Sequence, residues 1–172
     1  MHSLISRHAV VTADPWQVPE GGIGDAPQGG DLLVPLPVWL DARSLLRQRQ
    51  GRVGVRLAPG DDAALIAGDV DCLSLVAVDF PSITDGRGFS IARLLRERHG
   101  WRGELRATGP LTRDVLFYLA RCGFDSFELR EGEDPVAALA EFAAFDEVYQ
   151  GAVDRAAPFE RATTGAAAGS AR

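Results

Sequence analysis

The chain has 172 residues, of which 46% are hydrophobic and 24% are charged, values that fit one globular domain with a buried core. Its formal net charge of −6 argues against broad binding to nucleic acids or anionic membranes, because such binding requires a basic surface. All 18 basic residues are arginines, which excludes Schiff-base chemistry on a lysine and the lysine of a phosphate-binding loop.

The two cysteines, Cys72 and Cys122, are far apart in the sequence, and no CxxC pair or suitably spaced histidine accompanies them. This spacing excludes a zinc or iron–sulfur site built on them, and both are expected to be small buried residues. The first 16 residues lack a continuous apolar core, and no stretch approaches the roughly 20 apolar residues that cross a bilayer. We therefore expect a cytoplasmic protein without a membrane partner.

The N-terminal part of the chain predicts little regular structure. Residues 4–12 are sufficiently β-branched for a short strand, and Trp16 is expected to pack beside it. Residues 19–31 are rich in glycine and proline, which predicts a surface loop. The predicted divisions are an N-terminal strand with its Gly-rich loop, one α/β domain, and a disordered tail of Ala, Gly, Thr and Arg: residues 1–31, 32–150 and 151–172.

A helix is predicted to begin at Pro37 and to end at Gly51. After it the pattern changes to four consecutive strand–helix units, with Asp61 as the predicted cap of the first helix. Gly100 and Gly123 are expected to end the second and third of these helices. Residues that recur at helical spacing are expected to face the core, among them Leu45, Leu94 and Tyr118. The predicted strands are residues 53–57, 73–80, 104–108 and 124–129.

Polar residues alternate with apolar ones along three of these four strands. A sheet covered by helices on both faces should not show this pattern, because both of its faces would be apolar. We therefore predict an α/β fold in which four βα units form a parallel sheet like half of a (βα)8 barrel, with one face free of helices and an N-terminal extension. A doubly wound sheet is the alternative. The predicted polar face carries Arg56, Glu104, Arg106, Thr108, Ser126 and Glu128.

The junction after the second strand is the first candidate site, because ligands collect where parallel strands end and helices begin. Asp79 ends the strand, and residues 85–88 read Asp-Gly-Arg-Gly before a helix expected to begin at Gly88 or Ser90. Gly86 and Gly88 would allow close approach of a ligand, the first helical amides would favour an anion, and Arg87 would add a forked donor. Alternatively, Asp85 caps the turn, the glycines supply positive φ, and Arg87 pairs with Asp79 or Asp85.

The polar face is the second candidate site. Glu104, Arg106 and Glu128, with Arg56 nearby, predict either a charged network able to shift the pKa of a carboxylate or a structural ion-pair ladder. Arg113-Asp114 is interpreted as the first turn of a helix, where an acid complements the macrodipole. No histidine is placed for a catalytic triad, and the Arg87 charge competes with a cation for Asp79 and Asp85, so no metal site is expected.

Several motifs together resemble a known family. They are Asp79-Phe80-Pro81, residues 84–90, residues 92–98, Gly103-Glu104-Leu105-Arg106-Ala107, Arg113-Asp114 and residues 121–125. Across roughly residues 32–150 the chain resembles family nine-three-four of bacterial domains of unknown function, whose members are often labelled as oxidoreductases of sulfite reduction. The positions that fit the family pattern are Asp85, Arg87, Arg93, Arg96, Glu104, Arg106, Arg113 and Asp114.

The chain also departs from the family pattern. Ser82 and Ile83 stand where the family usually has a basic–aromatic pair, and Phe89 stands where tyrosine is usual. A lysine and a phenolic hydroxyl that could have contacted an anion are therefore missing, which weakens a catalytic role at these positions.

The resemblance implies an accessory protein of assimilatory sulfite reduction that contacts sulfite reductase or its electron donor. Two alternatives remain: a small enzyme or anion-binding domain for a sulfur oxyanion or phosphorylated metabolite, and a homodimeric scaffold. The chain has no flavin, nicotinamide, haem or cluster motif, so no cofactor is expected and a partner would handle the electrons. The candidate ligand or partner residues are Asp79, Asp85, Gly86, Arg87, Gly88, Ser90, Glu104, Arg106, Arg113 and Asp114.

Overall fold

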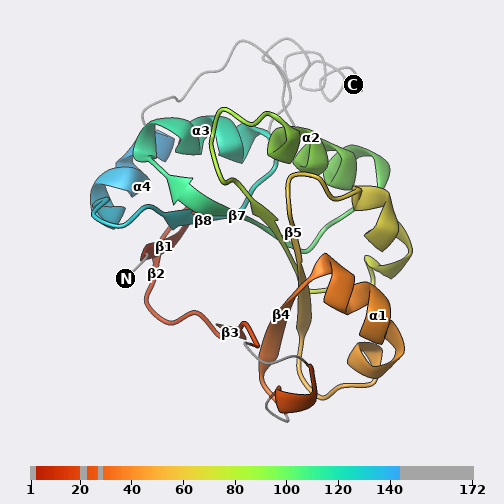
Figure 1. Cartoon of the computed structure of the whole chain (residues 1–172). Coiled ribbons are helices and arrows are strands. Elements are labelled where there is room, and N and C mark those ends of the chain that lie inside the picture. Colours follow the sequence, from red (N-terminus) through yellow and green to blue (C-terminus); the bar gives the residue numbers. More distant parts are fainter. Residues whose placement is uncertain (1–2, 20–22, 27–28, 144–172) are drawn as a thin grey trace, which may run out of the picture.

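The computed structural model describes residues 3–19, 23–26 and 29–143. These residues form one curled sheet of eight strands with helices along its outer face (Figure 1). In chain order the elements are β1 Ser3–Ser6, β2 Val10–Val11, β3 Trp16–Gln17, η1 Ile23–Asp25, β4 Asp31–Pro35, α1 Leu36–Arg47, β5 Val53–Leu57, η2 Ala63–Asp69, β6 Leu75–Asp79, α2 Arg87–Arg93, η3 Leu94–Arg98, β7 Glu104–Leu111, α3 Arg113–Arg121, β8 Ser126–Leu129 and α4 Pro135–Ala143.

The strands lie in the order β2-β1-β8-β7-β6-β5-β4-β3, which follows the chain from β3 to β8. Strands β3 to β8 are parallel, and β1 and β2 add an antiparallel pair beside β8. The predicted half-barrel shape is confirmed. The four predicted units are confirmed in part: their strands are adjacent and parallel, but a 3-10 helix follows β5, and two further parallel strands, β3 and β4, precede them.

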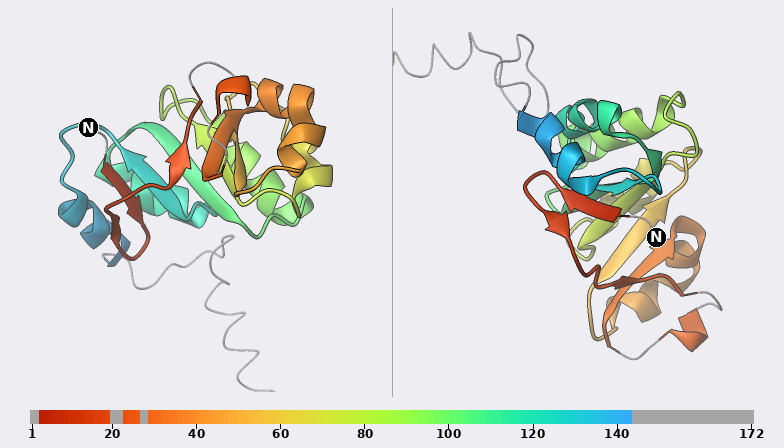
Figure 2. Two further views of the ribbon diagram at one scale, coloured as in Figure 1. Left: turned by 90° about the horizontal axis from the view of Figure 1, so that it is seen from below. Right: turned by 90° about the vertical axis from the view of Figure 1, so that its left-hand side faces the viewer.

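The convex face of the sheet carries the main core. Alternate residues of each strand point toward the helices, as Val55, Val78, Ala107 and Phe127 do, and all four are fully buried. The opposite, concave face holds a small apolar cluster of Trp16, Leu33, Leu75 and Ala77 at one end and polar side chains elsewhere. The described helices cover only the convex side (Figures 1 and 2).

Two predicted helix ends are confirmed, and a predicted cap is wrong. Gly100 and Gly123 adopt positive φ values of 67° and 105° after their helices, a conformation that glycine adopts without a steric penalty. The η2 helix is capped by Asp62, whose carboxylate accepts a hydrogen bond from the Ala64 amide. Asp61 instead accepts a hydrogen bond from the Ala58 amide, because residues 58–61 form a turn before the helix begins at Ala63.

Several core predictions are wrong. Trp16 packs on the concave face beside β4, at the opposite edge of the sheet from β1. Leu45 and Tyr118 are 62% and 57% exposed, and Leu94 is also exposed. These side chains lie at the margins of their helical faces, where helical spacing alone does not decide burial. Cys72 is exposed, whereas Cys122 is buried as predicted.

Phe80, directly after β6, organises the packing of the helices on the convex side. Its ring lies 5.1 Å from the Phe89 ring and 5.7 Å from the Phe124 ring, measured between centroids. A Cβ atom at Gly88 would lie 2.5 Å from the Phe80 ring, and one at Gly109 would lie 2.2 Å from the Phe80 carbonyl oxygen. Both glycines are therefore required for close packing around Phe80.

This packing predicts different effects for two substitutions in one loop. Gly88→Ala should lower the free energy of unfolding by about 1–3 kcal/mol, because the added methyl group overpacks the Phe80 ring. Gly86→Ala is the matched control: its Cβ would meet nothing within 4 Å, so the change should be about 1 kcal/mol or less. Urea unfolding of both variants measures the difference, and equal losses would contradict the packing role of Gly88.

Candidate functional site

Arg106, the third residue of β7, is the buried charge of the concave face. Its side chain is only 6% exposed, and Asp14 and Glu104 pair with it. Nη1 and Nη2 donate to the two carboxylate oxygens of Asp14, over 2.6 and 3.2 Å. Nε and Nη2 donate to Oε1 of Glu104, over 3.2 and 3.0 Å. The same Glu104 oxygen accepts from the Ser126 hydroxyl at 2.6 Å, which fixes the carboxylate from a neighbouring strand.

The electrostatics of Arg106 favour its charged form. Burial lowers the pKa of its guanidinium, but the hydrogen bond that it donates to Asp14 and the charges of Glu104 and Asp14 outweigh burial and raise the pKa above its usual value. A buried guanidinium is stable only when it is paired and hydrogen-bonded in this way. Arg106 is therefore a permanent, oriented cation on the concave face.

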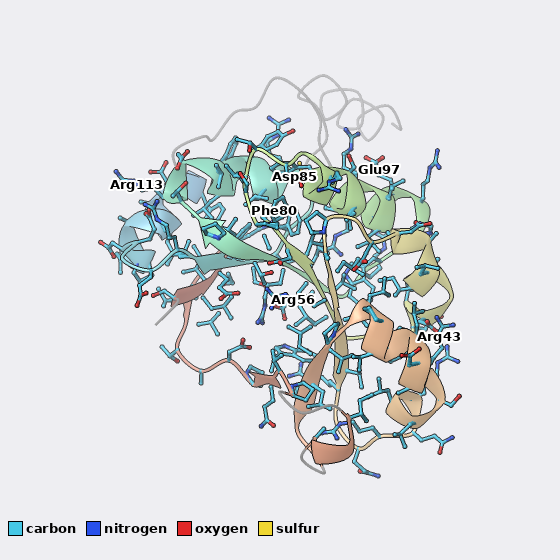
Figure 3. All side chains as sticks on the ribbon, in the orientation of Figure 1. Arg43, Arg56, Phe80, Asp85, Glu97 and Arg113 are labelled. Carbon is cyan, nitrogen blue, oxygen red and sulfur yellow. The ribbon has the colours of Figure 1, made fainter. Side chains whose placement is uncertain are left out.

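A second polar group lies nearer the carboxyl ends of the strands. Asp79 accepts hydrogen bonds from Nη2 of Arg56 at 2.9 Å and from the hydroxyl of Thr108 at 3.2 Å. The two side chains of the ion pair are 41% and 30% exposed, with Arg56 the more exposed. Figure 3 shows Arg56 inside the hollow of the half barrel, whereas Asp85 and Arg113 lie on the helical side.

The predicted network on the polar face is thus found for Glu104 with Arg106, whereas Arg56 lies in a second group with Asp79. Arg56 and Arg106 lie in one row across the sheet, separated by Ala77 of β6, so about 10 Å lies between their Cα atoms at the usual strand spacing. Glu128, half-buried on the same face, belongs to neither group among the described residues.

The loop before α2 does not form the predicted pocket. Arg87 is 64% exposed and pairs with Asp85, which is two residues before it, over 2.6 Å. The helix begins at Arg87, so Ser90 lies one turn inside it and does not supply a first helical amide. The Ser90 side chain is exposed. The predicted alternative is confirmed for the Asp85–Arg87 ion pair, but its prediction of positive φ is wrong, because neither Gly86 nor Gly88 has positive φ. The space beside Gly88 is filled by the Phe80 ring, whereas the space beside Gly86 is open.

Arg113 and Asp114 occupy the first turn of α3, and both are exposed. This agrees with their predicted place at the helix start. Like Asp85 and Arg87, they follow the carboxyl end of a parallel strand, so these exposed charges lie along one edge of the sheet. They are not brought together with Arg106 in one pocket.

A separate surface pocket of about 590 Å³ lies at the opposite, amino end of the strands. Its lining includes Arg96, which the family resemblance singled out, but each nitrogen of this guanidinium already donates hydrogen bonds. They go to the carbonyl oxygens of Trp101, Gly103 and Gly123 and to the carboxylate of Asp125. Arg96 therefore joins η3 to the loops before β7 and β8 and has a structural role.

Asp14 is the residue that sequence reasoning missed. It lies 92 positions from Arg106, in a segment that has no periodicity, so only the tertiary structure connects the two. Among the described residues, no group of three or more His, Cys, Asp or Glu side chains is placed to hold a metal ion. In the same residues, no helix is both long and apolar enough to traverse a bilayer.

Comparison with known proteins adds one match. The family of bacterial proteins of unknown function, DUF934, matches residues 54–159. The chain belongs to this family. No curated protein and no solved structure matches it. The DUF934 match covers β5 to α4 and contains Arg56, Asp79, Glu104 and Arg106, whereas Asp14 lies outside the matched residues.

The Asp85–Arg87 pair predicts a measurable titration. The hydrogen bonds from the Arg87 side chain and backbone lower the pKa of Asp85 from 3.8 to about 2. A lowered pKa in the folded state contributes stability above the unfolded value, and this contribution is lost as the pH falls through the folded pKa. NMR titration of the Asp85 carboxyl carbon should give a pKa of about 2, and Arg87→Gln should raise it toward the usual value of about 3.9. An unchanged pKa in the variant would contradict the ion pair.

Proposed function

We propose that this DUF934 protein is an accessory protein of assimilatory sulfite reduction that binds a protein partner along the carboxyl edge of its half barrel. The pathway and the partner, sulfite reductase or its electron donor, come from the family resemblance. The observation that supports a binding edge is the presence of charges at the carboxyl ends of three neighbouring strands, β5 to β7. Asp85 with Arg87 follows β6 and Arg113 with Asp114 follows β7, while Arg56 pairs with Asp79 at the ends of β5 and β6, inside the half barrel (Figure 3).

Charges of this kind suit a protein interface more than a catalytic centre. Arg87 and Arg113 are exposed, so a partner reaches them without opening the fold. Exposed charges arranged along an edge accelerate association and select the partner, although each contributes little to affinity on its own. Binding through this edge is therefore expected to weaken as the salt concentration rises.

The experiment is affinity capture from sulfate-grown cells, with mass spectrometry of the captured proteins. The wild-type chain should capture sulfite reductase or its electron donor. The double variant Arg87→Ala and Arg113→Ala should capture about tenfold less, because two interface charges of up to about 1 kcal/mol each are removed. Arg102→Ala, which removes an exposed charge at the opposite end of the strands, is the control and should leave capture unchanged. Failure of the wild-type chain to enrich either protein would contradict the proposal.

A second candidate function is binding of a small oxyanion, either as an anion-binding domain or as a small enzyme. The supporting observation is Arg106, a buried guanidinium fork on the open face of the sheet, with Arg56 in the same row. Forked donors of this kind recognise carboxylate, sulfate and phosphate through two parallel hydrogen bonds. Both guanidinium groups are paired with a carboxylate, but the Arg87 side chain is 64% exposed, whereas Arg106 is buried and Glu104 fixes its orientation. Arg106 is therefore the stronger candidate.

Calorimetric titration with sodium sulfite, sulfate or phosphate tests this second function. Binding should be saturable, and Arg106→Gln should weaken it at least tenfold, while Arg87→Ala should change it less than twofold, on the scale of about 1.4 kcal/mol per tenfold. Circular dichroism verifies that each variant is folded. Loss of binding in Arg87→Ala with binding retained in Arg106→Gln would assign the anion to the loop before α2.

A further inference from the structure

The segment between β2 and β3, residues 12–15, crosses the open side of the half barrel, and we call it the strap. It joins β2 at one edge of the sheet to β3 at the other (Figures 1 and 2). All four strap residues are exposed and lie outside helices and strands. Its far end is anchored by Trp16, which is buried against Leu33, Leu75 and Ala77 and lies 5.2 Å below the Arg52 guanidinium.

Asp14 is the strap residue that reaches the concave face. Its carboxylate binds the outer nitrogens of Arg106 through both oxygens, while Glu104 binds Nε and Nη2 from the same strand. Ser126 in turn fixes Glu104. Glu104 therefore holds the orientation of Arg106 independently of Asp14. The guanidinium would still face the concave side of the sheet if the strap moved away.

We propose that the carboxylate of Asp14 occupies an oxyanion site on Arg106, and that an external oxyanion binds there by displacing Asp14 and the strap. This proposal rests on the second function above and adds the regulation of that site. Two oxygens facing Nη1 and Nη2 are what the site recognises, so a carboxylate or a tetrahedral sulfite, sulfate or phosphate satisfies it. The exchange replaces one anion by another, so the buried guanidinium is never left unpaired, which would be costly.

The physical argument for displacement is a contrast in burial. The Arg106 side chain is 6% exposed, whereas Asp14 is 36% exposed, so the carboxylate that leaves is already at the solvent surface, and the incoming anion takes its place on the buried guanidinium. While Asp14 is bound, it and Glu104 together place two negative charges against one guanidinium. A second anion is therefore repelled unless Asp14 leaves.

Displacement lowers the apparent affinity of the wild-type chain. The apparent dissociation constant equals the intrinsic constant divided by the fraction of molecules in which the site is open. If Asp14 occupies the fork in about 90–99% of molecules, the wild-type chain binds an anion about 10- to 100-fold more weakly than a chain in which the strap carries no charge.

The test is calorimetric titration of the full-length chain with sodium sulfite, sulfate and phosphate at constant ionic strength. Asp14→Asn keeps the size of the side chain and removes its charge, and it should bind at least one of these anions tenfold or more tightly than wild type. Asp41→Asn also removes one negative charge, from an exposed side chain of α1, and as the matched control it should change affinity less than twofold. Asp14→Ala provides a second variant should the asparagine side chain destabilise the fold.

One double variant, Asp14→Asn with Arg106→Gln, decides between the possible outcomes. The gain in Asp14→Asn should disappear in Asp14→Asn with Arg106→Gln, because the fork is then absent. A gain that persists in this double variant would show a general charge effect and overturn the proposal. If wild type binds an anion through Arg106 but Asp14→Asn binds no more tightly, the strap proposal fails and the second function stands. If no chain binds any anion, both fail, while the partner-capture experiment remains independent.

Discussion

The pairing of one buried guanidinium determines how the concave face is built. Arg106 lies on a strand in the middle of the sheet, and the strand period of two directs its side chain away from the helices. An unpaired charge at that position would be prohibitively costly, so acids must come from the sheet itself and from another segment. Glu104 supplies the first, and Asp14, carried across the open side of the half barrel, supplies the second.

The two faces of the sheet therefore solve different problems. The convex face buries alternate strand residues under helices, and Phe80 with Gly88 and Gly109 determines how closely α2 and β7 approach the segment after β6. The concave face has few apolar residues, and Trp16 covers them at one end. On the rest of this face, charged side chains form hydrogen bonds with one another. The end nearest Arg56 and Asp79 is partly open to solvent.

Sequence reasoning succeeded where the signal was local. Alternation in Glu104-Leu105-Arg106-Ala107-Thr108 predicted a polar face, and the positions of Gly100 and Gly123 predicted two helix ends. It failed where distant segments decide the outcome. Strand β3 is two residues long and has no periodicity to detect, and Asp14 in an Asp-Pro dipeptide has the pattern of a turn. Likewise, nothing in the local pattern at Gly88 indicates that an aromatic ring excludes a side chain there.

The arginines that match the family pattern differ in burial and in how many of their donors are already hydrogen-bonded, and therefore in their roles. Arg96 is enclosed, and its donors are occupied by carbonyl oxygens and Asp125, so it stabilises the amino end of the strands. Arg87 and Arg113 are exposed at the carboxyl end, where charge affects association more than folding. Arg106 combines both properties, because it is buried yet half of its partners come from an exposed segment. Since the chain has no lysine, every one of these positions carries a planar fork, and only a fork can be fixed by Glu104 and still offer two parallel donors to another anion.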